Sequence, residues 1–267
     1  MISIELISKG EASLKEVLES IQNQSYKDYE IICADSSNNI DVKNLLLDYN
    51  CKVIELPENS PHLIARYTAH KHADGDRSLI LDSTRPLKDN ALELLYNSYY
   101  KYDMVILREG SLGQGFWVNQ AKLVKDVSEM QSNRLNSETL AFLLPRFYNS
   151  ELLTNAFENI IENTGKLFDK ISYGEHHIIF DECKKISNNI SITNELLLSH
   201  YEDDSLKKII KKYYWYGKSQ KVLRGLHGSA ASNLSTHIRK NVGFKMRIKT
   251  IPINIARGIP FVLGYIL

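Results

Sequence analysis

Two aspartates stand where a parallel sheet would bind a ligand. Asp35 follows the apolar run of residues 30–34, and Asp82 follows a second run at residues 78–81. In open α/β sheets, ligands bind in the crevice beyond the carboxyl ends of the strands. We therefore expect one crevice to hold both carboxylates, which could accept hydrogen bonds from a ligand or coordinate a divalent cation.

The first hundred residues alternate strand and helix patterns. After the first strand, Ser13 and Glu16 match a capping box, and apolar residues then recur at helical spacing. Further helices are expected at residues 41–47 and 60–73. This alternation predicts an α/β fold, with a mostly parallel central sheet and helices on both faces. The predicted strands are residues 2–7, 30–34, 51–56, 78–81 and 104–107.

The middle of the chain is less regular. The glycine-rich segment SLGQGFWV, residues 111–118, has the pattern of a loop entering a strand, and residues 139–167 show a helical pattern with breaks. A helix of about twenty residues is predicted from Ser205, because Asp203 and Asp204 suit a helix N-terminus.

Composition narrows the class of protein. Hydrophobic residues make up 43% of the chain and charged residues 24%, which is typical of a globular protein. Three scattered cysteines are too few for a disulfide framework or a zinc site. We expect no signal peptide and no membrane-spanning helix, because Pro252, Arg257 and Pro260 interrupt the last apolar segment.

Charge is unevenly distributed along the chain. From Asp203 onward there are thirteen Lys or Arg and two Asp or Glu, a net charge of +11, whereas the preceding 202 residues carry a net charge of −10. Such a cationic segment suggests a polyanionic partner, either nucleic acid or an anionic membrane surface. We expect no nucleic-acid partner, because no nucleic-acid-binding fold or base-stacking platform is recognisable.

The cationic segment also carries aromatic and aliphatic side chains between its lysines. This composition is typical of a helix that lies in a membrane interface. Each cation near anionic lipid adds about 1 kcal/mol, which makes peripheral attachment at the cytoplasmic membrane face the expectation. A helix packed on the domain explains the first part of the segment equally well, and a homo-oligomer interface is the alternative for the final apolar part.

Three blocks of the sequence resemble family 2 glycosyltransferases. SLKEVLESIQNQSYKDYEIICADSSN is similar to the family's opening helix–strand unit, which ends in Asp. ARYTAHKHADGDRSLILDS is similar to the segment that ends in the family's D-x-D motif, and SHYEDDSLKKIIKKYYWYGKS is similar to its C-terminal element. The match covers residues 1–90 well and residues 195–220 moderately.

The resemblance implies a Rossmann-like GT-A fold and an inverting sugar transfer. The donor would be a nucleotide sugar, a UDP- or GDP-sugar, and the acceptor a glycan or a lipid-linked glycan. We expect residues 1–200 to form the nucleotide-sugar-binding and catalytic domain. Residues 201–267 would form a basic, amphipathic helical extension that associates with the membrane.

The resemblance also implies roles in donor binding. Asp35 would hydrogen-bond the nucleotide base, and the alternative is a turn residue at a strand end. Arg66 would lie near the nucleotide or its diphosphate, and the alternative is a surface ion pair on a helix.

The metal-binding motif departs from the family pattern. D-x-D reads Asp82-Ser83-Thr84 here, and a hydroxyl is a weaker ligand than a carboxylate for Mg²⁺ or Mn²⁺. Two interpretations stay open: Asp82 binds a divalent metal with help from His200, or Arg85 holds the diphosphate and replaces part of the metal's role. A third is that Thr84 and Arg85 only shape a turn.

The catalytic base of the family sits in an E-D pair before a helix. The corresponding residues here are Glu175 and His176, and either side chain could accept a proton. A polar loop with solvated histidines is the alternative. Since two motifs depart from the pattern, a catalytically silent nucleotide-sugar-binding or scaffold protein is the alternative to an enzyme.

Overall fold

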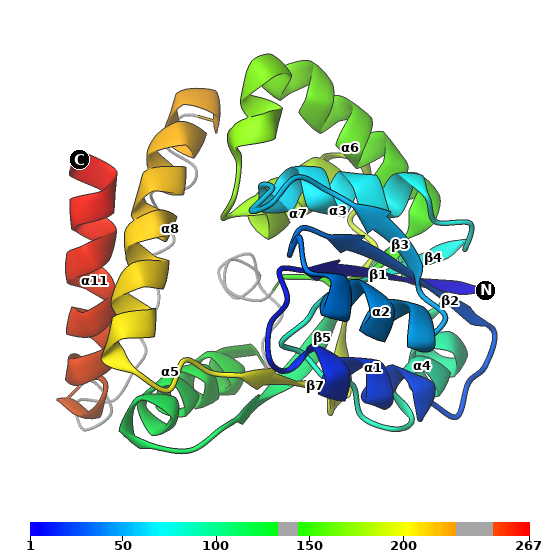
Figure 1. The fold of residues 1–267 in the computed structure, drawn as a ribbon, viewed down its shortest axis with the longest axis horizontal. Coiled ribbons are helices and arrows are strands. Elements are labelled where there is room, and N and C mark those ends of the chain that lie inside the picture. The colour runs from blue at the N-terminus through cyan, green and yellow to red at the C-terminus, as the bar shows by residue number, and fades with distance from the viewer. Residues whose placement is uncertain (133–143, 228–247) are drawn as a thin grey trace. The chain divides into compact units, whose positions relative to one another are not determined.

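The computed structural model describes residues 1–132, 144–227 and 248–267 (Figure 1). The chain divides into two compact units. The first comprises Met1–Glu109 and Pro145–His200, and the second comprises Gly110–Leu144 and Tyr201–Leu267. The second unit thus combines the residues beyond the predicted boundary at residue 200 with the segment that follows Glu109.

A seven-stranded sheet runs in the order β3-β2-β1-β4-β6-β5-β7. β1 pairs in parallel with β2 and β4, and β2 pairs in parallel with β3. β6 is antiparallel to both β4 and β5. The predicted mostly parallel sheet is therefore confirmed. The strands are β1 (Ile2–Ser8), β2 (Tyr29–Asp35), β3 (Lys52–Glu55), β4 (Arg77–Asp82), β5 (Met104–Leu112), β6 (Phe147–Asn149) and β7 (Ile190–Tyr201).

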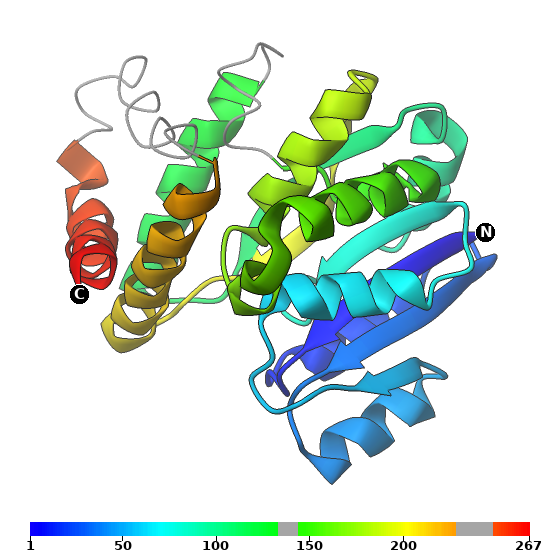
Figure 2. The same cartoon turned by 90° about the horizontal axis from the view of Figure 1, so that it is seen from above.

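Helices cover both faces of this sheet in the first unit, as the sequence predicts. Alternate residues Ile4 and Leu6 of β1 pack with α1, α2 and α4, whereas Ile7 packs with Ala65 and Ala69 of α3 on the other face. α6 and α7 lie on the same side of the sheet as α3 (Figures 1 and 2). The helices are α1 (Leu14–Gln22), α2 (Ile40–Asp48), α3 (His62–Lys71), α4 (Ala91–Leu94), η1 (Leu95–Tyr99), α6 (Ser150–Thr164), η2 (Gly165–Lys170) and α7 (Glu175–Ile186).

The second unit is built around α5 (Phe116–Ser132), α8 (Leu206–His227) and α11 (Ile251–Ile266). Its small core contains Ile209 and Ile253. α8 and α11 come closest at Gly217 and Gly264, where a Cβ on either glycine would overlap the backbone of the other helix. The predicted helix after Ser205 is confirmed. No helix in the described part of the chain is long and apolar enough to cross a membrane.

Two local expectations are wrong, and a third holds only in part. The SLGQGFWV segment leads into helix α5, because Gly113 and Gly115 take positive φ angles of 105° and 109° that reverse the chain before the helix begins. Ser13 does not cap α1; its hydroxyl donates to the backbone oxygen of Ser83 at 2.8 Å. The segment predicted as helical with breaks contains α6 and η2, and its residues 147–149 form β6, a strand too short to show an alternating pattern; its residues 139–143 lie outside the described part of the chain.

Candidate functional site

Three arginines converge on Asp82 at the carboxyl end of β4. Arg66 and Arg85 each form an ion pair with one carboxylate oxygen of Asp82, and Arg146 Nη1 lies 3.2 Å from Asp82 Oδ2. Arg66 Nη1 also donates to the backbone oxygen of Leu81 at 2.6 Å. The fold thus gathers guanidinium groups from α3, from the loop after β4 and from the segment before β6. We call Arg66, Arg85 and Arg146 the arginine cluster.

The arginine cluster keeps Asp82 ionised. Burial alone would raise the pKa of Asp82, but Arg66, Arg85 and Arg146 outweigh it and hold that pKa well below its usual value. Burial, followed by the neighbouring Arg85, lowers the pKa of Arg146 to about 10, so this guanidinium is still charged at neutral pH. Glu109 contributes a second carboxylate, which accepts from Arg85 Nε at 2.8 Å.

His176 lies beside the arginine cluster at the start of α7. Its Nε2 is 3.1 Å from Arg66 Nη2 and 3.5 Å from Arg146 Nη1. Because both arginine atoms are donors, Nε2 must accept, which assigns the proton to Nδ1. Burial, together with Arg66 and Arg146, lowers the pKa of His176 well below its usual value, so the ring is neutral.

Glu175 is the buried carboxylate that precedes His176. Gly174 caps α7 with a positive φ of 86°, which favours glycine and turns the chain so that Glu175 enters the site. Its Oε1 lies 3.6 Å from His176 Nε2 and 3.9 Å from both Arg66 Nη2 and His62 Nδ1. Burial raises the pKa of Glu175, although Arg66 opposes the shift.

These contacts favour Glu175 over His176 as the proton acceptor. A carboxylate whose pKa is raised is better matched to accept a proton near neutral pH. The Nε2 of His176 already faces two guanidinium donors, and its pKa is lowered. The neighbouring His62 is neutral as well, because burial, Lys9 and Arg66 lower its pKa to about 4. Both catalytic assignments stay predictions, and Glu175 is the stronger one.

Asp35 lies at the same edge of the sheet as Asp82, as predicted. The strand register places Asp35 beside Ser8 and Asp82 beside Ile7, so the two aspartates flank the end of β1. Two interstrand spacings of about 4.8 Å separate them by roughly 10 Å. Asp35 is 4% exposed, and the backbone N–H and hydroxyl of Ser37 donate to its carboxylate at 3.2 Å and 2.8 Å.

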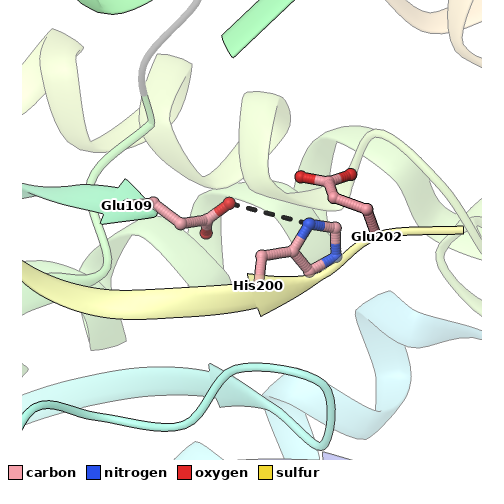
Figure 3. A group of neighbouring side chains, drawn as sticks. All are labelled: Glu109, His200 and Glu202. Carbon is pink, nitrogen blue, oxygen red and sulfur yellow. Dashed lines mark ion pairs between the residues drawn. The ribbon is translucent and has the colours of Figure 1, made fainter. Parts of the chain in front are cut away.

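A second group of polar side chains could hold a divalent cation (Figure 3). Glu109, His200 and Glu202 each offer one ligand atom, and these atoms lie within 4.8 Å of one another. Glu109 Oε1 is 3.7 Å from His200 Nδ1, and Glu202 also pairs with Lys125 at 2.7 Å. Carboxylate oxygens and an imidazole nitrogen suit Mn²⁺, and the carboxylates suit Mg²⁺. This donor set therefore fits a divalent metal.

The surroundings of Asp82 fit a divalent metal less well. Two unit charges about 4 Å apart interact by about 4 kcal/mol at an effective dielectric constant of 20, and a dication at Asp82 would meet about twice this repulsion from each arginine of the cluster. The structure links Asp82 to His200 indirectly, through Arg85 and Glu109. The joint metal role of Asp82 and His200 stays a prediction.

Sequence reasoning does not identify Arg146, Glu109 or His62. Arg146 precedes a three-residue strand, which gives no periodic signal. Glu109 could have been found, because it follows the apolar run at residues 104–107 just as Asp35 and Asp82 follow theirs. His62 opens α3, and Ser60 and Pro61 before it signal only the start of a helix.

Comparison with solved structures identifies similar folds. The chain is 18% identical to S. aureus TarS in a complex with UDP, with a TM-score of 0.58 over 98% of this chain and 80% of that chain. Against a longer TarS structure, identity is 14% and the TM-score is 0.56, over 99% of this chain and 54% of that one.

A third similar structure is glucosyl-3-phosphoglycerate synthase from Mycobacterium tuberculosis, in a complex with Mn²⁺, UDP and glucosyl-3-phosphoglycerate. Identity is 18% and the TM-score is 0.57, over 85% of this chain and 80% of that chain. At these identities the likeness shows the fold, which confirms the expected GT-A architecture. No curated protein matches the chain in sequence.

The family model described as glycosyl transferase family 2 matches residues 6–140, about half of the chain. The matched region runs from within β1 through β5 and contains Asp35, Arg66, Asp82 and Arg85. The chain therefore belongs to glycosyl transferase family 2.

Proposed function

We propose that this glycosyltransferase moves a sugar from a UDP-sugar to a hydroxyl of a glycan or lipid-linked acceptor, with inversion at the anomeric carbon. The observation that carries the proposal is the gathering of Asp35, the arginine cluster and Glu175 in the first unit. UDP in the TarS and glucosyl-3-phosphoglycerate synthase structures supports a UDP-sugar over a GDP-sugar as the donor.

Each part of the proposed reaction is assigned to a different residue or group of residues along the sheet edge. Asp35 accepts a hydrogen bond from the base, and the arginine cluster, roughly 10 Å away by strand spacing, faces the diphosphate. As the bond from the anomeric carbon to the diphosphate oxygen breaks, fixed guanidinium groups stabilise the charge that develops on the leaving group. Glu175 takes the proton of the acceptor hydroxyl as that oxygen attacks from the opposite side. A divalent cation held by Glu109, His200 and Glu202 would add positive charge beside Arg85.

The membrane part of the proposal rests on α11. Large aliphatic side chains at spacings of three and four residues occupy one helix face, and their exposed fractions lie between 48% and 65%. The opposite face is covered, because Ile253, Ala256 and Gly264 are buried on it. The exposed residues are Ile251, Ile255, Ile259, Val262 and Ile266, which we call the aliphatic face.

Charge favours a lipid surface as the partner of the aliphatic face. From Ser205 onward the sequence has thirteen basic residues and no acidic residue. Lys207, Lys208 and Lys211 are exposed on α8, the helix that packs against α11. An apolar face flanked by cations matches the interface of an anionic bilayer, and the cytoplasmic leaflet is the anionic one. We infer that the enzyme acts there on a lipid-linked acceptor.

A donor screen tests the proposed reaction. The full chain is incubated with UDP- and GDP-sugars, with glycan and lipid-linked acceptors, and release of nucleoside diphosphate is measured with and without Mn²⁺. We expect acceptor-dependent release of UDP from one of the UDP-sugars. UDP binding without turnover on every donor and acceptor would favour the catalytically silent alternative.

A further inference from the structure

Two buried nitrogen atoms at the arginine cluster have no hydrogen-bond partner among the residues that the structure describes. Arg66 is fully buried, and its Nε has no hydrogen-bond partner among the residues that the structure describes. The Nδ1 of His176 is also buried and has no hydrogen-bond partner among the described residues. Buried donors of this kind indicate a missing acceptor.

The position of the cluster in the sequence points to the same missing acceptor. Asp82 is followed by Thr84 and Arg85, so a guanidinium group stands next to the place where the D-x-D motif has its second carboxylate. Asp82 Oδ2 faces Arg85 and Arg146, and Oδ1 faces Arg66. A dication bound to these oxygens would have to displace the guanidinium groups. A diphosphate needs no such displacement, because its oxygens accept paired N–H donors from arginine.

We propose that the partly exposed Arg85 and Arg146 bind the donor's diphosphate directly while the buried Arg66 neutralises Asp82, and that nucleotide binding requires no divalent cation at Asp82. The inference rests on the proposed function, and it assigns to the arginine cluster the charge neutralisation that a metal ion supplies at an intact D-x-D motif. Asp82 then positions the three guanidinium groups. A cation at Glu109, His200 and Glu202 is compatible with the inference, provided that UDP binds in its absence.

Calorimetric titration of the full chain with UDP, UMP and uridine tests the inference, first in EDTA and then with Mn²⁺. We expect the UDP affinity in EDTA to lie within about threefold of that in Mn²⁺. Arg146→Gln is expected to weaken UDP binding by about 10- to 100-fold in EDTA, because it removes a charged hydrogen-bond donor, and to change uridine binding by less than about threefold. Arg108→Gln, on β5, removes a guanidinium group that donates to the backbone oxygen of Asn194, and serves as the matched control.

The possible outcomes distinguish failure of the inference from failure of the proposed function. UDP binding that is lost in EDTA and restored by Mn²⁺ overturns the inference but leaves the donor assignment intact. Equal losses of UDP and uridine affinity in Arg146→Gln also overturn it. Absence of UDP binding under both conditions overturns the proposed function as well. If Arg146→Gln fails to fold, Arg85→Gln is titrated in its place, with the same expected selectivity for UDP over uridine.

Discussion

The two units distribute charge and apolar surface in opposite ways. In the first unit, Arg66 is fully buried against Asp82, and core residues such as Ile4 and Leu79 are covered by helices. In the second unit, Ile255 and Ile259 are 54% and 58% exposed on α11, and Lys207, Lys208 and Lys211 are exposed on α8. The first unit therefore buries the ionic cluster around Asp82, whereas the second exposes both lysines and aliphatic side chains.

This difference indicates two kinds of partner. A buried ionic cluster is expensive to desolvate and contributes little to stability by itself, so its retention fits a small anionic ligand that uses it. A continuous exposed aliphatic face is unfavourable in water, so it fits an apolar surface. We interpret the first unit as the part that binds the donor and the second as the part that brings the enzyme to its acceptor.

Replacing Glu175 should give the largest effect on activity. The substitution tests whether the first unit supplies the proton acceptor. Glu175→Gln keeps the shape of the side chain but removes the proton acceptor. We expect kcat to fall by about 100- to 10,000-fold, the usual contribution of a general base. Steady-state release of UDP measures the loss, and Glu158→Gln, an exposed carboxylate on α6, is the matched control.

The pH profile provides an independent check of the same residue. A base works only when it is deprotonated, so kcat/KM should rise with pH through the pKa of Glu175. Because burial raises this pKa above its usual value of 4.5, the acid limb should lie above pH 4.5. Residual activity of Glu175→Gln that keeps the same acid limb would show that another group accepts the proton.

Replacing Arg66 should give the next largest effect, this time on stability. Arg66→Met leaves Asp82 partly unpaired in a buried site, which costs about 3–5 kcal/mol of the free energy of unfolding. Lys211→Met, on the surface of α8, should change it by no more than about 0.5 kcal/mol. Both substitutions remove a cation, so the difference between their effects on the free energy of unfolding compares a buried charge with an exposed one.

The two tryptophans allow the two units to be followed separately. Trp117 and Trp215 are the only ones in the chain, and both lie in the second unit. In urea unfolding of Arg66→Met, the far-UV circular dichroism midpoint should fall while the tryptophan fluorescence midpoint stays near its original value. An unshifted circular dichroism midpoint would contradict the structural role assigned to Arg66.

Much of the first unit could be predicted because its signals are local. Short apolar strands ending in Asp35 and Asp82 identify the sheet edge from the sequence alone, and residues 1–90 carry the family motifs. Parallel strands align their carboxyl ends, so two strand-end aspartates predict one site. The register confirms this placement.

The arginine cluster could not be predicted because it depends on distant pairing. Arg146 reaches Asp82 because the short strand β6 inserts antiparallel beside β4, and a three-residue strand gives no periodic signal. The sequence motifs point to Arg85 and Arg66 separately, whereas their shared contact with Asp82 is a property of the fold. The neutral state of His176 also follows from tertiary contacts, since burial and two arginines lower its pKa.

The aliphatic face of α11 is the next feature to test. In the double variant Ile255→Ser with Ile259→Ser, two half-exposed side chains can no longer enter the bilayer interface. We expect binding to anionic vesicles to weaken by about 2–3 kcal/mol, roughly 30- to 150-fold. Leu47→Ser on α2 removes a similarly exposed aliphatic side chain, at 51%, from the first unit and is the matched control.

Vesicle sedimentation measures this binding, and donor turnover in solution should stay unchanged in the double variant. Unchanged vesicle binding would contradict the lipid proposal. If the double variant instead converts a dimer into a monomer in analytical ultracentrifugation, the aliphatic face belongs to a second copy of the chain, the alternative that the sequence raised.

Replacing a single lysine of α8 should give the smallest effect on vesicle binding. This substitution measures the contribution of charge apart from that of apolar contact. Lys207→Gln removes one exposed cation, so binding to anionic vesicles should weaken by about 1 kcal/mol, or roughly fivefold. The loss should fade at high salt, where screening shortens the range of the interaction, and should be absent on uncharged vesicles. Lys15→Gln, exposed on α1 of the first unit, is the matched control. Equal losses from Lys207→Gln and Lys15→Gln would mean that net charge, and not the position of the lysine on α8, controls attachment.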